Sequence, residues 1–345
     1  MRARDHGIVI GRAGPGTYNA ITDVPGVGVG QANAHPDHTG VTVIVPGLDR
    51  DCWLEPYPVG AARLNGAAEV AGITQVDEGG LAETPIFLTA TPYVGAVYAA
   101  ATAVLAEVQP RIGRDDVVIP IVGECNSSDV CDVRDGPIPD RALVGRALRS
   151  AASGVVAEGQ VGAGVGMSCF DWAGGIGTSS RVVDGWTIGV LLLVNFGDAE
   201  ELRVAGDAVG RSRIPPTRGS EGSCVCVVAT DAPLLGAQLE RLARRAFLGL
   251  ARTGSYASNG SGEVAVAFST ANRAMLARGR QADVLTLDVL PNDALNPLFL
   301  ATVDAAEEAV LNALFGARTI VGAMGTLSAF VDGQCVVSKI PGVSL

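Results

Sequence analysis

Residues 223–273 read SCVCVVATDAPLLGAQLERLARRAFLGLARTGSYASNGSGEVAVAFSTANR. The apolar run at 223–229 predicts a buried strand, and the run at 263–269 predicts a second one. Between them, apolar side chains recur every three or four positions, which predicts an amphipathic helix over 233–252. A strand, a helix and a strand in direct succession indicate an α/β protein.

The ends of this helix carry recognisable signals. Thr230 or Asp231 is the expected N-cap, and Pro233 suits a first turn. Gly254 follows the expected last turn, where glycine commonly ends a helix. The helix is therefore the element whose limits the sequence defines best.

The same alternation of strands and helices extends outward through the chain. Apolar runs and periodic stretches predict strands at 41–45, 117–123, 187–196 and 334–339, helices at 140–157 and 302–314, and a link or short helix at 320–325. The polar stretch 211–222 is the clearest break in composition, but no long linker is visible. We expect stacked sheets with helices outside, while the length alone allows one large body or two domains.

Composition excludes two classes of protein. Apolar residues make up 48% of the 345 residues, which is ample material for a core, so the chain is not disordered. The net charge is −11 and no run of Lys and Arg occurs. A nucleic-acid surface needs clustered cations, so no nucleic-acid partner is expected.

Histidine and cysteine usage argues against a metal centre. The chain has 3 His, at His6, His35 and His38, and none of its 7 Cys forms the CxxC spacing of a zinc site. We expect no metal and no cofactor, and we interpret Cys224 and Cys226 as core thiols. The first residues contain no apolar signal-peptide core, which predicts a reduced, cytoplasmic protein. So few histidines also disfavour a Ser-His-Asp triad.

Two other patterns have ordinary explanations. Residues 84–106 are uncharged and long enough to cross a bilayer, but Pro85, Pro92 and Gly95 interrupt them. We interpret this stretch as a strand, a turn and a helix, and expect no membrane partner. The glycines at 26–30 and at 162–166 lack the G-x-G-x-x-G spacing of a dinucleotide-binding loop.

Several polar residues stand where catalysis often occurs, at the ends of apolar strands. Ser223 follows Gly222 where the polar stretch meets a buried strand, and Asn195 and Glu124 each end or follow one. Ser261 and Glu263 lie two positions apart, hence on one face if the strand has begun. Taken singly, each has a structural explanation: a strand-opening serine, a capping asparagine, a glycine-serine turn before a solvated glutamate.

Taken together, these segments resemble the L-aminopeptidase/D-esterase family of the DmpA type, which includes the β-aminopeptidases. The resemblance covers nearly the whole chain, in order: ITDVPGVGVG (21–30), TGVTVIVP (39–46), LNGAAEVAGITQVDEGGLAETPIFLT (64–89), VGEC (122–125), ATDAPL (229–234), RLARRAFLGLARTGS (241–255) and NGSGEVAVAFSTANR (259–273). The predicted helix at 301–314 also matches.

This resemblance implies a fold, a processing step and an assembly. The fold is a four-layer αββα sandwich, like that of the N-terminal nucleophile hydrolases. A single domain of residues 1–345 cuts itself between Gly222 and Ser223 into an α-chain, 1–222, and a β-chain, 223–345. Gly219-Ser220 is a local rival for the cut, but Ser223 opens the strand that runs into ATDAP. The family also implies a homo-oligomer, a tetramer.

The resemblance also assigns roles to residues. Once Ser223 is N-terminal, it carries the nucleophile and an amine whose reference pKa is about 7.7–8.0, near the optimum for a general base. Ser261 would relay a hydrogen bond to Ser223 and Glu263 would orient it, while Asn195 would stabilise the oxyanion. Glu124 would anchor the free amine of the substrate. The family's tyrosine a few residues after this Glu is missing here, because positions 126–129 read NSSD, and this puts the substrate range in question.

The predicted function is therefore a self-processing serine aminopeptidase or amidase. It would release N-terminal residues from short peptides, amides or esters that carry a free amine, through an acyl-enzyme. Two alternatives remain at this stage. One is an acyl transferase like ornithine acetyltransferase, which uses a Thr nucleophile that finds no match here. The other is a binding protein of the same fold that never matures.

Overall fold

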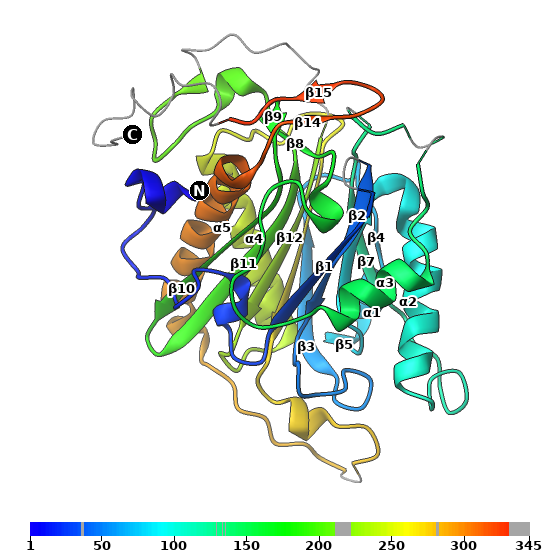
Figure 1. Cartoon of the computed structure of the whole chain (residues 1–345). Helices are drawn as coiled ribbons and strands as arrows, with labels where there is room; N and C mark the ends of the chain where they lie inside the picture. The colour runs from blue at the N-terminus through cyan, green and yellow to red at the C-terminus, as the bar shows by residue number, and fades with distance from the viewer. Residues whose placement is uncertain are drawn as a thin grey trace.

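The computed structural model describes residues 1–35, 38–128, 130–132, 134, 136–210, 222–280 and 283–330. The strand expected at 334–339 and the rival junction Gly219-Ser220 lie outside these ranges. Figure 1 shows two sheets packed face to face, with helices on the two outer sides.

The first sheet has five strands in the order β1-β2-β6-β7-β4. Its pairs are antiparallel except for β6 and β7, which run parallel. The strands and the two helices on its outer face are β1 (Gly28–His35), β2 (Thr39–Val45), β4 (Val70–Ala71), β6 (Ile86–Ala90), β7 (Ile121–Cys125), α2 (Val94–Val108) and α3 (Arg141–Arg149).

The second sheet has six strands in the order β10-β11-β12-β13-β3-β5. β12 and β13 are parallel neighbours, so the chain must cross over between them, and the helix α4 is that crossover. The elements of this half are β3 (Tyr57–Arg63), α1 (Ile73–Gly79), β5 (Leu81–Ala82), β10 (Gly175–Val183), β11 (Trp186–Asn195), β12 (Ser223–Thr230), α4 (Gly236–Arg252), β13 (Gly262–Ser269) and α5 (Asn296–Gly316).

Alternating side chains on the strands build the layers. On β12, Val225 and Val227 point between the sheets and pack with Leu88 of β6. Cys224 and Cys226 point the other way, into the core under α4 and α5. A separate cluster joins α2 and α3 to the first sheet. The order helix, sheet, sheet, helix confirms the predicted αββα sandwich.

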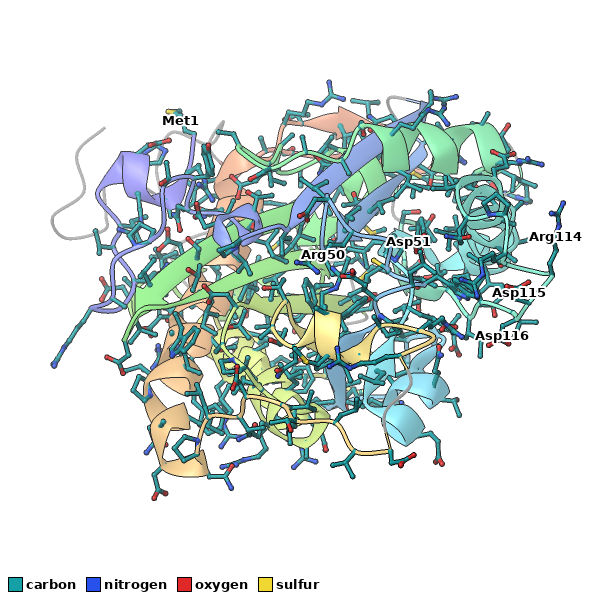
Figure 2. All side chains as sticks on the ribbon, turned by 90° about the horizontal axis from the view of Figure 1, so that it is seen from below. Met1, Arg50, Asp51, Arg114, Asp115 and Asp116 are labelled. Atoms are coloured by element: carbon teal, nitrogen blue, oxygen red, sulfur yellow. The ribbon has the colours of Figure 1, made fainter. Side chains whose placement is uncertain are left out.

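Side chains fill the space that the ribbons leave open. Figure 2 draws all of them and shows dense packing between and outside the sheets, whereas the charged side chains of Arg114, Asp115 and Asp116 lie at the outer edge. Two two-stranded sheets complete the described structure: β8 (Ser168–Cys169) with β9 (Trp172–Ala173), and β14 (Ile320–Val321) with β15 (Thr326–Leu327).

Several predicted limits were wrong, each for a local reason. The helix expected to reach 157 ends at Arg149, because the chain then pairs with β1: the Ala152 carbonyl accepts from the Val29 amide at 3.0 Å. The helix α4 begins at Gly236 and not near Thr230, which still belongs to β12. Its N-cap residue is Leu235, whose amide donates to the Gln238 side chain at 3.1 Å.

Other limits shift in the same way. The strand expected from 117 begins at Ile121, directly after Pro120. The helix expected over 302–314 extends to Asn296–Gly316, and 320–325 contributes β14 to a hairpin rather than a helix.

Residues 84–106 form β6, a short turn and most of α2, as predicted. The stretch Thr91–Val108 is long and apolar enough to cross a membrane by length and composition. In the fold, α2 buries Val97, Ala101 and Val104 against the first sheet.

Candidate active site

Ser223 opens β12 at the end of the second sheet. In the register, it lies between Asn195 of β11 and Gly262 of β13. Its side chain is buried. The Gly222 carbonyl accepts a hydrogen bond from the Gly262 amide at 3.0 Å. A Cβ atom on Gly222 would lie 2.4 Å from the carbonyl oxygen of Asn195, so this junction requires glycine.

The Ser223 hydroxyl faces the other sheet. Val225, two positions on, packs between the sheets, and alternation places the Ser223 side chain on the same face. There the main-chain N–H of Asn126, directly after β7, donates to Ser223 Oγ at 3.4 Å. Ser223 therefore sits where the ends of the two sheets meet.

Ser261 and Glu263 form a buried pair beside this junction. The Ser261 hydroxyl donates to the Glu263 carboxylate. Asn65 steadies the preceding turn, since its side-chain amide donates to the carbonyls of Ala257, at 2.9 Å, and Ser258, at 3.1 Å. Burial raises the pKa of Glu263 above its ordinary value, while the nearby Ser261 and Asn65 side chains oppose the increase.

The Asn195 side chain has a defined orientation. Its Oδ1 atom accepts from the Ser168 amide at 2.8 Å and from Ser168 Oγ at 3.0 Å. A main-chain amide can only donate, so Oδ1 and not Nδ2 must face Ser168. The Nδ2 donor therefore points away from Ser168. Asn195 itself pairs with Ser223 across β11 and β12.

Glu124 is a buried carboxylate near the end of β7. Its Oε1 atom accepts from the Glu69 amide at 2.7 Å, and its Oε2 atom accepts from the Thr91 hydroxyl. Burial raises its pKa above the ordinary value, and these two hydrogen bonds oppose the increase. An ammonium group that reached this carboxylate would find a buried partner of opposite charge.

Four of the predicted site residues form two pairs in the structure, and Glu124 lies apart from both pairs among the described hydrogen bonds. Ser223 and Asn195 are cross-strand neighbours, and Ser261 and Glu263 are bonded to each other. Among the described contacts, no hydrogen bond links Ser223 to Ser261 or to Glu124. In the register Glu263 is level with Cys224, whose side chain points to the helix side, whereas the Ser223 hydroxyl points between the sheets. The relay from Ser261 to Ser223 stays a prediction.

Sequence reasoning missed several supporting residues, among them Thr91, Ser168 and the Asn126 amide. One signal was available: Thr91 and Asn126 each follow an apolar strand, and β6 and β7 are parallel neighbours. The ends of parallel strands meet at one sheet edge, so polar residues there come together. Ser168 lies in an irregular stretch and had no such signal.

A pocket of about 270 Å³ is lined in part by Asn126, whose main-chain amide contacts Ser223 Oγ. It is lined by Thr91, Pro92, Tyr93, Asn126, Ser127, Ser128 and Cys131. Although positions 126–129 hold no aromatic residue, Tyr93 brings one from the segment between β6 and α2. His38, directly before β2, places Nε2 at 2.9 Å from the Tyr93 hydroxyl.

The described residues contain no group of three or more His, Cys, Asp or Glu side chains able to hold a metal ion. Cys224 and Cys226 have Sγ atoms 3.7 Å apart and are buried in the core under α4 and α5. They are core thiols, as we interpreted them.

The fold and the site define a class. A serine behind a glycine at a strand end, in two stacked sheets between helix layers, is the arrangement of an N-terminal nucleophile hydrolase. The chain belongs to peptidase family S58, whose profile matches residues 19–328.

Individual relatives agree with this family. The chain is 40% identical to the β-peptidyl aminopeptidase BapA of Sphingosinicella microcystinivorans, over 94% of this chain and 88% of the relative. A β-aminopeptidase from Burkholderia sp. has a TM-score of 0.90 at 40% identity, covering 98% of this chain and 97% of that one. The L-aminopeptidase D-Ala-esterase/amidase of Ochrobactrum anthropi has a TM-score of 0.88 at 36% identity, covering 95% of each chain.

These findings identify the chain as an aminopeptidase. The alternatives of an acyl transferase and of a non-catalytic binding protein find no support among these relatives.

Proposed function

We propose that this aminopeptidase matures by cutting itself between Gly222 and Ser223, into chains 1–222 and 223–345, and then releases N-terminal residues from short amine-bearing peptides, amides or esters. One observation carries the proposal: the carbonyl of the junction accepts a hydrogen bond from the Gly262 amide at 3.0 Å, with the Ser223 side chain directly after it.

The processing step follows from these positions. Ser223 Oγ attacks the Gly222 carbonyl carbon, the C–N bond breaks, and the hydroxyl proton ends on the departing nitrogen. Water then hydrolyses the ester, which frees the Gly222 carboxylate and the Ser223 hydroxyl and amine. The Gly262 amide stabilises the charge that develops on the carbonyl oxygen, as an oxyanion-hole donor does.

In the mature enzyme, one residue supplies both nucleophile and base. The freed amine takes the proton from Ser223 Oγ as this atom attacks the substrate carbonyl, and an acyl-enzyme forms. Asn195 Nδ2 donates to the oxyanion. Ser261 and Glu263, bonded to each other beside the junction, position the new amine, and Glu124 binds the substrate ammonium.

The substrate class rests on the relatives. Two are named for β-peptides or β-amino acids, and a third for L-amino acids and D-alanine esters. We propose short substrates with a free amine at the α or β carbon. Turnover of alanine p-nitroanilide against its β-alanine analogue would measure the preference.

The pH profile provides a first prediction. We expect kcat/KM to rise between about pH 6 and 8, because the amine, with a reference pKa of about 7.7–8.0, must be neutral to act as base. Burial raises the pKa of both Glu124 and Glu263 above 4.5, so each protonates, and activity falls, at a higher pH than for a solvated carboxyl. Initial rates on alanine p-nitroanilide from pH 4.5 to 9 test this. A flat profile between 6 and 8 would contradict the amine base.

A second prediction concerns Glu124→Gln. A charged hydrogen bond to the substrate ammonium is lost, which should raise KM by about 10- to 100-fold and change kcat little. The matched control is Glu69→Gln: Glu69 is exposed, keeps its main-chain hydrogen bond to Glu124 in the variant, and otherwise acts on Glu124 only through the repulsion between two carboxylates, so KM should change far less than in Glu124→Gln. Equal KM values for the wild type and Glu124→Gln would remove Glu124 from the amine site.

We further propose a homo-oligomer and a cytoplasmic location. The oligomer rests on the family resemblance, and light scattering of the purified protein measures it. Buried free thiols are the state expected of cysteines in a reducing compartment, and five of the described cysteines are in that state: Cys52, Cys125, Cys169, Cys224 and Cys226.

A further inference from the structure

The pocket lined by Thr91 and Asn126 adjoins the two groups that a substrate must reach. At one side, Thr91 donates its hydroxyl to Glu124, the proposed ammonium anchor. At the other, the Asn126 amide lies 3.4 Å from Ser223 Oγ, the proposed nucleophile. Two residues that line the pocket thus contact the two groups, so a residue that spans from amine to scissile carbonyl would have this pocket beside its side chain.

The size and chemistry of the pocket restrict that side chain. Its volume, about 270 Å³, is below the roughly 300–1,000 Å³ of pockets that hold drug-sized ligands, so it suits one side chain. None of the seven described residues that line it is charged, and its surface is mostly apolar. Burying a charged side chain there without a partner would cost binding free energy.

Two residues that line this pocket, Tyr93 and Cys131, form hydrogen bonds to the same further residue, His38. The His38 ring shares a hydrogen bond with the Tyr93 hydroxyl, Nε2 to Oη at 2.9 Å. The His38 carbonyl accepts from the Cys131 thiol. Tyr93 is only 3% exposed, and burial raises its pKa, so the phenol stays neutral in the pocket.

We propose that this pocket takes the side chain of the released residue, that Tyr93 is a specificity-determining residue selecting uncharged side chains, and that His38 is a positioning residue acting through Tyr93. This inference rests on the proposed roles of Glu124 and Ser223.

The test compares side-chain preference in wild type, Tyr93→Leu, Tyr93→Phe and His38→Leu, using L-alanine, L-phenylalanine and L-lysine p-nitroanilides. For wild type, kcat/KM should be at least about tenfold higher for alanine than for lysine. Tyr93→Leu should raise the phenylalanine-to-alanine ratio about tenfold, mostly through KM, because the smaller side chain enlarges the pocket.

His38→Leu and Tyr93→Phe should each shift this ratio by about threefold in the same direction. Because both remove one hydrogen bond, the double variant should shift it no further than either alone. The matched control is Tyr98→Phe, a tyrosine of α2 that packs with the α2–α3 cluster, and it should keep the wild-type ratio. If Tyr93→Leu does not fold, the phenylalanine-to-alanine ratios of the two single hydrogen-bond variants and of their double variant test the proposal.

Calorimetric binding of free L-leucine and L-lysine gives a readout that needs no turnover. Leucine should bind wild type more tightly than lysine, and Tyr93→Leu should change the leucine affinity. An unchanged substrate ratio in a folded Tyr93→Leu variant, or equal binding of the two amino acids to wild type, would overturn the inference. A chain that neither cuts itself nor hydrolyses any anilide would overturn the proposed function instead, and the binding data would still decide the pocket.

Discussion

Replacing Ser223 by alanine should leave the purified protein as one 345-residue species, whereas wild type yields fragments of 222 and 123 residues. The variant lacks the oxygen that attacks the Gly222 carbonyl, so neither the ester nor the free amine forms. Activity on alanine p-nitroanilide should fall by about 10⁴-fold or more, because nucleophile and base are lost together. Intact-mass measurement and a denaturing gel report the cut, and initial rates report the activity.

Ser220→Ala is the matched control for this experiment. Ser220 also follows a glycine, only three positions earlier, and its loss should leave both fragments and the activity unchanged. The N-terminal sequence of the smaller wild-type fragment should begin SCVCVV. An intact, active wild-type chain, or normal cleavage of the Ser223→Ala variant, would contradict self-processing at this junction.

Replacing Asn195 by alanine should lower kcat by about 10²- to 10³-fold, which corresponds to roughly 2.7–4 kcal/mol for one oxyanion-hole donor. KM should change little, because the donor acts on charge that exists only in the transition state. The physical basis is the fixed amide: Oδ1 is held by Ser168, so Nδ2 is already oriented before substrate binds.

The variant Ser168→Ala distinguishes the orientation of the Asn195 side chain by Ser168 from the hydrogen bond that Asn195 Nδ2 donates to the oxyanion. This variant removes the hydroxyl contact to Asn195 Oδ1 but keeps the main-chain contact at 2.8 Å, so a loss of less than about tenfold in kcat is expected. Steady-state kinetics of the two variants on the same ester and anilide substrates provide the comparison. Should Asn195→Ala raise KM and leave kcat intact, Asn195 would be a substrate-binding residue and not an oxyanion donor.

Much of the fold follows from patterns in short segments. The runs at 187–196 and 223–229 are mostly apolar because β11 and β12 are buried on both faces. The helix α4 was predictable for a different reason: one face packs on the sheet and the other meets solvent, so its apolar residues repeat at helical spacing.

Element limits were less predictable, because distant partners decide them. Nothing near Arg149 stops a helix; the chain leaves α3 there to pair with Val29, about 120 positions earlier. Tyr93 and Asn126 line one pocket because β6 and β7, the strands that precede them, are parallel neighbours.

By itself, the sequence determined the layered α/β architecture and the set of polar residues at strand ends. These features depend on the period of side-chain burial and on local chemistry, and both are properties of contiguous residues. Only the tertiary structure decided which strand ends meet: Ser223 with Asn195 and Asn126, Glu124 with Thr91, and His38 with Tyr93. Strand order and parallel pairing bring such residues together across long stretches of chain, and no local pattern encodes that pairing.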